Sequence, residues 1–156
     1  MVELRAASAS DLAPLSELAL RSKGFWGYDD AFLAACRAEL TLARGRLDTD
    51  QIVLAEVDGT PVGYFALVMR PPGAELTDLF VEPAAIGSGV GRRLWDELLS
   101  RAVAAGAAWL DIEADPFAAA WYLRRGARQI GTVPSGSIPG RELPRLRVEL
   151  AARDAE

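Results

Sequence analysis

Three glycines stand close together near the middle of the chain, at Gly87, Gly89 and Gly91. A strand-like run, ELTDLFV, precedes them, and a strongly helical pattern begins at the last of the three. Glycines at such a junction let backbone N–H groups approach an anion closely, and the positive end of the helix dipole attracts it. The spacing therefore predicts a cradle for phosphate groups. A tight strand-to-helix turn without a ligand is the alternative interpretation.

Two familiar phosphate-binding patterns fit this segment poorly. The P-loop needs Gly-Lys followed by Ser or Thr, but Gly91 is followed by Arg92 and Arg93. The dinucleotide fingerprint needs a third glycine where this chain has Arg92, although Asp111 does lie at the ribose-binding distance. Only about 45 residues follow Asp111, which is too few for the second half of a doubly wound sheet. The cradle is therefore of another kind.

Histidine is absent from the sequence, and Cys36 is the only cysteine. These two facts exclude Ser-His-Asp and Cys-His catalysis, histidine-based metal sites, intramolecular disulfides and iron–sulfur clusters. Acid–base chemistry, if the chain is an enzyme, must come from Asp, Glu, Tyr, Lys, Ser or Thr. Cys36 lies at helical spacing with apolar neighbours, which is typical of a core residue and argues against an acyl-carrying thiol.

The charge balance bears on partners and location. The 156 residues include 17 Lys and Arg against 22 Asp and Glu, a formal net charge of −5. A chain with this balance has no general basic face, so we expect no nucleic-acid partner. No apolar run approaches the roughly 20 residues that span a bilayer, and the first residues, MVELRA, lack a signal-peptide core. We therefore expect no membrane partner and a cytoplasmic location.

The rest of the pattern indicates the elements that must hold the cradle. Alternating apolar residues predict strands, and apolar residues at helical spacing predict helices. Asp58-Gly59 between two β-rich runs predicts a hairpin. Strands are expected at 2–7, 51–57, 61–69, 75–81, 108–114, 128–133 and 145–150. Helices are expected at 12–21, 30–40, 91–105 and 116–125, and a long polar loop at 135–144.

This order of elements predicts a mixed α/β (α+β) domain with about seven strands flanked by four helices. No repeat or linker divides the sequence, so one domain is expected over residues 1–150. Residues 151–156 are expected to form a C-terminal tail.

The glycine segment, LFVEPAAIGSGVGRRLW, resembles the pyrophosphate loop of the GNAT superfamily, the acetyl-CoA-dependent N-acetyltransferases. In that family a strand ending in Val-x-Pro leads to Arg/Gln-x-x-Gly-x-Gly/Ala at the head of a long helix. Val81, Pro83, Gly89 and Gly91 match this pattern, whereas Ile86 replaces the family's Arg or Gln. Because such a loop binds mainly through backbone N–H groups, the replacement predicts weaker cofactor affinity rather than none.

A second segment, DPFAAAWYLRRGAR, resembles the family's Asn-x-x-Ala-x-x-Phe-Tyr-x-x-x-Gly-Phe helix. Asp115, Ala118, Tyr122 and Gly126 hold the matching places, with Asp for Asn and Trp121 for Phe. Two motifs in the family's order, within a matching order of elements, imply a GNAT-like fold. They also imply an enzyme that moves an acetyl group from acetyl-CoA directly to an amine, with no metal and no covalent enzyme intermediate.

The resemblance implies roles for individual residues. Tyr122 matches the family's general acid, which protonates the departing thiolate, and Glu75 matches a catalytic glutamate that several members keep on the central strand. A packing tyrosine and a structural carboxylate are the alternatives, and Asp78 and Glu113 are the other candidate bases. The expected cofactor-binding residues are Leu79, Phe80, Val81, Ile86, Gly87, Ser88, Gly89, Val90, Gly91, Arg92, Asp115 and Ala118.

The acceptor side is expected in two stretches, the turn FWGYDD and the loop PSGSIPGRELP. Both resemble a bacterial GNAT subgroup with a Trp-Gly-Tyr turn and a Ser-Gly-Ser-Ile-Pro-Gly-Arg loop, a resemblance that fixes no acceptor. Hydroxyl and guanidinium groups in the loop suit a carboxylate or phosphate on the acceptor, while the net negative charge favours a cationic one. A core-anchoring turn and a solvated loop are the alternatives. The expected acceptor-binding residues are Trp26, Tyr28, Ser135, Ser137 and Arg141.

The expected partners are therefore acetyl-CoA and an amine acceptor, and a homodimer is left open. The alternative function is a non-catalytic acyl-CoA-binding sensor or interaction module. It draws support from Ile86, which departs from the loop pattern, and from the unfixed identity of the base.

Overall fold

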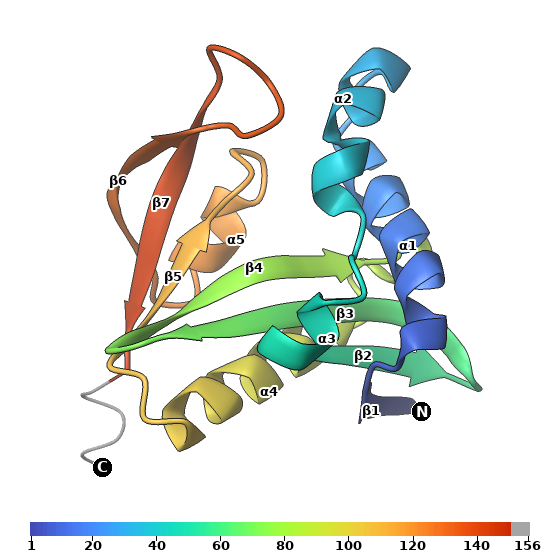
Figure 1. Cartoon of the computed structure of the whole chain (residues 1–156), viewed down its shortest axis with the longest axis horizontal. Helices are drawn as coiled ribbons and strands as arrows, with labels where there is room; N and C mark the ends of the chain where they lie inside the picture. The colour runs from blue at the N-terminus through green and yellow to red at the C-terminus, as the bar shows by residue number, and fades with distance from the viewer. Residues whose placement is uncertain (151–156) are drawn as a thin grey trace.

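Seven strands form one mixed sheet, in the order β1-β2-β3-β4-β5-β7-β6 (Figure 1). The computed structural model describes residues 1–150, and the C-terminal tail expected at 151–156 lies outside them. The predicted mixed α/β fold with seven strands is confirmed. The strands are β1 (Val2–Ala6), β2 (Gln51–Val57), β3 (Thr60–Arg70), β4 (Gly73–Val81), β5 (Trp109–Glu113), β6 (Arg128–Pro134) and β7 (Glu142–Glu149). The helices are α1 (Leu12–Gly24), α2 (Asp30–Leu40), α3 (Arg46–Thr49), α4 (Val90–Ala104) and α5 (Ala119–Leu123), with 3-10 turns at Ala9–Asp11 and Pro83–Ala85.

Antiparallel pairing builds most of the sheet because short turns join several consecutive strands. The predicted hairpin at Asp58-Gly59 is confirmed, since β2 pairs with β3 and the two turn residues have positive φ angles of 51° and 79°. β3 pairs with β4, β5 with β7, and β6 with β7, all antiparallel. β4 and β5 instead run parallel, because α4 carries the chain from the end of one to the start of the other.

Helices cover both faces of the sheet, so a core lies on each side. α4 and α5 pack on one face, over residues such as Phe65 and Leu110. α1 and α2 pack on the other, over Leu54, and Cys36 is 3% exposed there as predicted for a core residue. Figure 1 shows α1 and α2 above the long β2–β4 strands and α4 below them. Alternate residues of the central strands therefore supply the two cores.

The sequence predicts four helices, whereas five lie within the described residues. The additional one is α3, a single turn that is too short to show helical periodicity in the sequence. Its first residue, Arg46, donates to Asp50 one turn later at 2.8 Å, which stabilises the turn. α1 also continues to Gly24, beyond its predicted end at Arg21.

Two boundaries near the C-terminus differ from prediction. α5 begins at Ala119 rather than 116, because the chain first makes a turn in which the Asp115 carboxylate accepts from the Phe117 N–H at 2.9 Å. β7 begins at Glu142, inside the predicted loop 135–144, because residues 142–144 pair with β6 and the Pro144 carbonyl accepts from Ala114. A proline carbonyl can extend a strand although proline has no N–H to donate.

The one parallel strand pair separates soon after it forms. β4 and β5 pair from Ala74 with Leu110 to Leu76 with Ile112. Beyond these residues β4 continues to Val81 without a β5 partner, and its register with β3 shifts at the same level. Such an irregularity bends a strand. A gap therefore opens between the two central strands, beside backbone groups of β4.

Candidate active site

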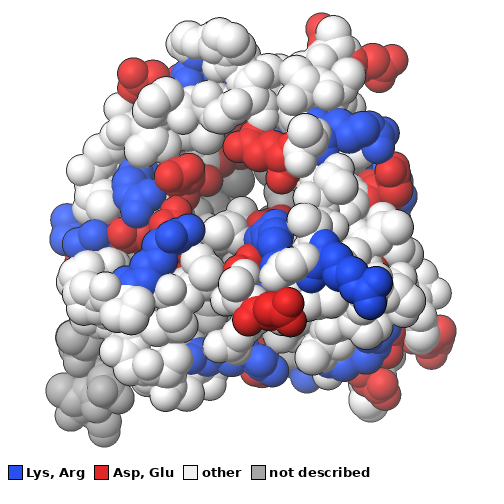
Figure 2. Space-filling view, viewed as in Figure 1, with Lys and Arg blue, Asp and Glu red and all other residues white. Residues whose placement is uncertain are grey.

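A cavity of about 880 Å³ lies where β4 and β5 separate. Figure 2 shows the molecule hollowed there, with side chains of both charges at the rim. We name its two ends by the residues that line them. The glycine end is lined by Gly87, Gly89, Gly91, Arg92 and Arg125. The carboxylate end is lined by Glu39, Asp50, Glu75, Asp78, Glu113 and Asp115.

The glycine end has an open backbone where β4 leads into α4. Gly87 and Gly89 have φ angles of 86° and 94°, in the left-handed region that favours glycine, and Gly89 is the N-cap of α4. A Cβ added at either glycine would meet no atom within 4 Å. Ile86 is 43% exposed at the same turn. The first N–H groups of α4 have no acceptor within the helix, and the glycine turn beside them leaves room for an anion.

Most residues predicted to bind the cofactor line this cavity, and two do not. Val90, the first residue of α4, is buried in the core, and the Ser88 hydroxyl donates to the Ala85 carbonyl within the turn. Their side chains therefore serve packing and turn geometry. The predicted residues that line the cavity are Leu79, Phe80, Val81, Ile86, Gly87, Gly89, Gly91, Arg92, Asp115 and Ala118.

Arg125 brings a half-buried positive charge to the glycine end. Its guanidinium carbon lies 3.5 Å from the centre of the Trp121 ring, and Nη1 donates to the Trp121 carbonyl at 3.0 Å. Its Nε is buried and has no hydrogen-bond partner among the described residues. Burial lowers the pKa of Arg125, and the like charges of Arg92 and Arg124 lower it further. A guanidinium group in these surroundings is suited to an anion.

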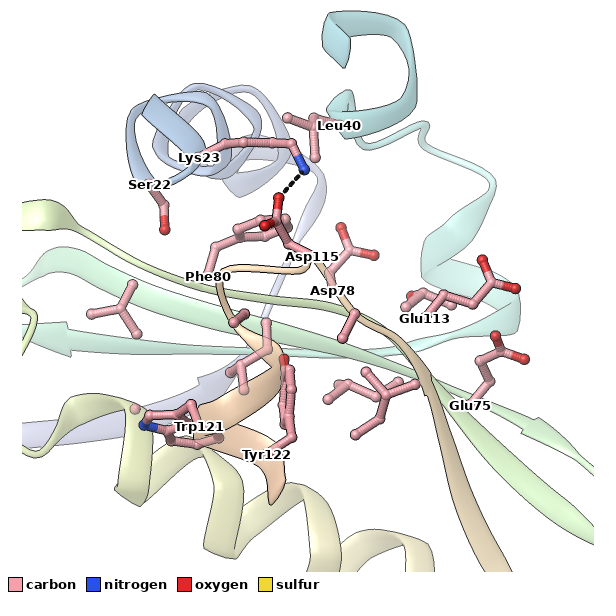
Figure 3. A pocket seen from close by; sticks show the side chains of 18 of the residues that line it. Ser22, Lys23, Leu40, Glu75, Asp78, Phe80, Glu113, Asp115, Trp121 and Tyr122 are labelled. Atoms are coloured by element: carbon pink, nitrogen blue, oxygen red, sulfur yellow. Dashed lines mark hydrogen bonds and ion pairs between the residues drawn. The ribbon is translucent and has the colours of Figure 1, made fainter. Parts of the chain in front are cut away.

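Tyr122 on α5 lies deep in the cavity. It is 7% exposed, and its hydroxyl points into the cavity (Figure 3). Trp95 and Trp121 pack against its ring, with 5.6 and 5.3 Å between ring centroids. Burial raises the pKa of the Tyr122 phenol, and the negative charges of Asp115 and Asp78 raise it further. The hydroxyl is therefore protonated at neutral pH and can donate a hydrogen bond or a proton.

Glu75 on β4 lies at the carboxylate end. Arg70 and Arg145 each contact its carboxylate with an N–O distance of 3.4 Å, and Arg145 also contacts Glu113 at 3.1 Å. Figure 3 shows Glu75 beside Glu113 and well apart from Tyr122. The predicted base and the predicted acid therefore line one cavity without lying next to each other.

Asp78 lies on β4 where the register with β3 shifts, and it is 5% exposed. Its Oδ1 accepts from Arg46 at 2.8 Å and its Oδ2 accepts from the Tyr64 hydroxyl at 3.0 Å. Burial raises the pKa of Tyr64, and Asp78 raises it further. The charge of Asp78 also raises the pKa of Tyr122, so this carboxylate acts electrostatically on the predicted acid. The sequence gives no signal for Arg46, which lies 32 residues before its partner.

Two of the predicted acceptor-binding residues meet at Asp115. The Tyr28 hydroxyl donates to the Asp115 carboxylate at 3.0 Å, and the Lys23 Nζ lies 3.1 Å from it. Arg141 lies 3.6 Å from Asp115 and also donates to the Tyr28 hydroxyl. Although burial opposes it, the Phe117 N–H and the charge of Lys23 lower the pKa of Asp115. Lys23 was not predicted, because it lies 92 residues from Asp115 and no local spacing links the two.

The other three lie around the same end of the cavity. Trp26 lines it and stacks on Phe117, with 5.9 Å between ring centroids. The Ser135 oxygen accepts from two N–H groups of its own loop, so this hydroxyl shapes the loop. The Ser137 hydroxyl donates to Glu39 on α2. Trp26 therefore lines the cavity directly, while the serines act on its surroundings.

No group of three or more His, Cys, Asp or Glu side chains in residues 1–150 has an arrangement that could hold a metal ion. No helix in the same range is long and apolar enough to cross a membrane.

The fold and the cavity together define a class of enzyme. A glycine turn between β4 and the start of α4 and the hydroxyl of Tyr122 on α5 line one cavity, and these are the two segments that carry the sequence motifs. The family model for the acetyltransferase (GNAT) family matches residues 15–127. Because this match covers most of the sequence, the chain belongs to the acetyltransferase (GNAT) family. The predicted acetyl-CoA-dependent N-acetyltransferase is thereby confirmed.

Solved structures with the same fold come from several microorganisms. The PaiA N-acetyltransferase of Thermoplasma acidophilum, in complex with coenzyme A, is 19% identical with a TM-score of 0.81, over 96% of this chain and 99% of that one. A GCN5-related N-acetyltransferase from Rhodopseudomonas palustris is 24% identical with a TM-score of 0.78, over 95% of each chain. The ribosomal-protein-S18-alanine N-acetyltransferase of Escherichia coli is 17% identical with a TM-score of 0.72, over 97% and 95%. A comparison with curated proteins finds no match.

Proposed function

We propose that this chain transfers an acetyl group from acetyl-CoA directly to a primary amine bound at the carboxylate end. The observation that carries the proposal is the buried Tyr122 hydroxyl, which points into the gap between β4 and β5. The phosphate groups of acetyl-CoA would meet the start of α4 and Arg125, since both are suited to anions. The thioester would then lie between the separated strands, near Tyr122.

The attacking nitrogen must be neutral, because a protonated amine has no lone pair with which to attack the thioester carbonyl. A primary amine resembling lysine has a pKa near ~10.4 and arrives protonated, so a base must remove its proton directly or through water. We propose Glu75 for this step, as the sequence resemblance implies. Asp78 and Glu113 line the same cavity and are the other candidates, and the charge of Asp78 also raises the pKa of Tyr122.

Tyr122 is proposed to protonate the sulfur as the carbon–sulfur bond breaks. A complete proton transfer would be uphill, since a thiolate has a pKa near ~8.5 and burial raises the pKa of Tyr122 above its usual value. Two transfers are therefore coupled: as the carbon–sulfur bond breaks, the hydroxyl gives its proton to the sulfur and regains one from the positively charged nitrogen of the tetrahedral intermediate. The base passes the first ammonium proton to water, this second proton ends on the thiol product, and no phenolate accumulates.

The experiment is calorimetry with acetyl-CoA, followed by thiol-release assays over a panel of small amines, peptides and proteins. Binding of acetyl-CoA with amine-dependent thiol release supports the proposal. Tight binding without turnover of any amine would indicate an acyl-CoA-binding sensor instead. A chain that does not bind acetyl-CoA would rule out both functions.

A further inference from the structure

Asp115 joins three segments that lie far apart in the sequence. Lys23 is near the end of α1, Tyr28 lies in the turn between α1 and α2, and Arg141 lies in the loop between β6 and β7. Lys23, Tyr28 and Arg141 all contact the Asp115 carboxylate, and Arg141 also contacts the Tyr28 hydroxyl. We call these four residues the Asp115 bridge.

The Asp115 bridge is shielded from solvent. The side chains of Asp115, Lys23 and Arg141 are 13%, 15% and 18% exposed. Removing one partner of a shielded ion pair leaves a charge without compensation, whereas exposed pairs contribute little. Burial, followed by the charge of Asp115, raises the pKa of Tyr28 to about 12, so its hydroxyl is a hydrogen-bond donor at neutral pH. The bridge therefore holds the three segments in fixed positions relative to one another.

Two further contacts join segments around the carboxylate end of the cavity. The Ser137 hydroxyl donates to Glu39, which fastens the β6–β7 loop to α2. Trp26 stacks on Phe117 and joins the α1–α2 turn to the segment before α5. Glu39 and Trp26 both line the cavity, so these contacts lie on its wall. Figure 1 shows the β6–β7 loop and α2 on the same side of the long β2–β4 strands. We call the loop, the turn and α2 together the roof.

We propose that the roof restricts the acceptor to a small, free-standing primary amine and excludes the lysines and N-termini of folded proteins. This inference rests on the proposed function and adds the substrate class. A polypeptide would have to lie where the Asp115 bridge and the Ser137–Glu39 contact join the segments around the carboxylate end. A small amine can enter whole beside Glu113, which lines the cavity and is 45% exposed. Cavities of several hundred Å³ are of the size that holds small molecules.

The first test compares acceptors of increasing size on the unaltered chain, with acetyl-CoA consumption followed by thiol release. The probes are the best small amine from the panel, a lysine-containing pentapeptide and folded lysozyme. We expect kcat/KM to fall at least about a hundredfold from the small amine to lysozyme. Equal or faster turnover of the pentapeptide or lysozyme overturns this inference and still supports the proposed function. Turnover of no amine of any size overturns both.

The second test loosens the roof. Tyr28→Phe and Ser137→Ala together remove two hydroxyl groups that fasten it, and we expect the pentapeptide to gain at least about tenfold in kcat/KM relative to the small amine. Asp115→Asn removes the charge that compensates Lys23 and Arg141, so a gain of at least the same size is expected. Arg128→Gln is the control, because it breaks only the exposed pair with Glu149 on the same hairpin. An unchanged ratio in both roof variants would refute the inference.

Discussion

At the scale of single residues, the chemistry depends most on the Tyr122 hydroxyl. Tyr122→Phe keeps the ring that packs on Trp95 and Trp121 and removes only the proton donor. We expect kcat to fall by about 10²- to 10⁴-fold, the usual contribution of a positioned acid or base, while KM for acetyl-CoA changes far less. Steady-state thiol release at saturating amine measures both constants. An unchanged kcat would show that Tyr122 has a packing role alone.

The group that deprotonates the acceptor amine can also be identified by substitution of single residues. Glu75→Gln should lower kcat/KM near neutral pH and leave a steep rise toward the pKa of the amine, because the amine must then lose its proton without help from a carboxylate. The pH–rate profile of the variant measures this directly. Glu149→Gln is the control, since Glu149 also pairs with an arginine but does not line the cavity. If Glu75→Gln leaves the profile unchanged, Asp78→Asn and Glu113→Gln become the decisive substitutions.

At the scale of elements, the glycine turn and the segment after α5 both line the end of the cavity where we expect the phosphate groups of acetyl-CoA. Ile86 gives the turn no charge of its own, and Arg125, two residues after the end of α5, lies at the same end of the cavity. We expect Arg125→Gln to raise the Kd for acetyl-CoA about tenfold, in the range of a charge-assisted contact, with little change in kcat at saturation. Calorimetry measures the Kd, with Arg128→Gln as the exposed-arginine control. An unchanged Kd would mean that the backbone of the glycine turn binds the phosphate groups without Arg125.

How much the sequence predicts also depends on the element. Local signals predicted the Asp58-Gly59 hairpin, the glycine turn and the placement of Tyr122 on a short helix, and the structure has each of them. α3 was not predicted because its four residues are too few to show the helical spacing of apolar residues. The Asp115 bridge escaped it for another reason: Tyr28 lies 87 residues from Asp115, and only the folded sheet brings the two together. Contacts between residues so far apart produce no local spacing pattern from which they could be predicted.

At the scale of the whole molecule, the groups with shifted pKa values fall into two sets on either side of neutrality. In the acidic set, Arg5 lowers the pKa of Asp11 and Arg21 lowers that of Glu82, through hydrogen bonds in each case. Their stabilising contribution is complete above the unfolded values near ~4 and is lost as pH falls through the folded values. In the alkaline set, burial raises the pKa of all three tyrosines. Their contribution is complete below about pH 10 and is lost as pH rises through the raised values.

The absence of histidine gives the region between these sets a testable property. Histidine is the side chain that ordinarily titrates between pH 5 and 8, and this chain has none. We therefore expect the free energy of unfolding to vary by less than about 1 kcal/mol from pH 5 to 8, to fall below about pH 4 and to fall again above about pH 10. Urea unfolding followed by far-ultraviolet circular dichroism across this range measures it. Any steep pH dependence of activity between pH 5 and 8 would then belong to the reaction and not to the fold. A marked change of stability within that interval would show that carboxylates or amines with strongly shifted pKa values take the place of histidine.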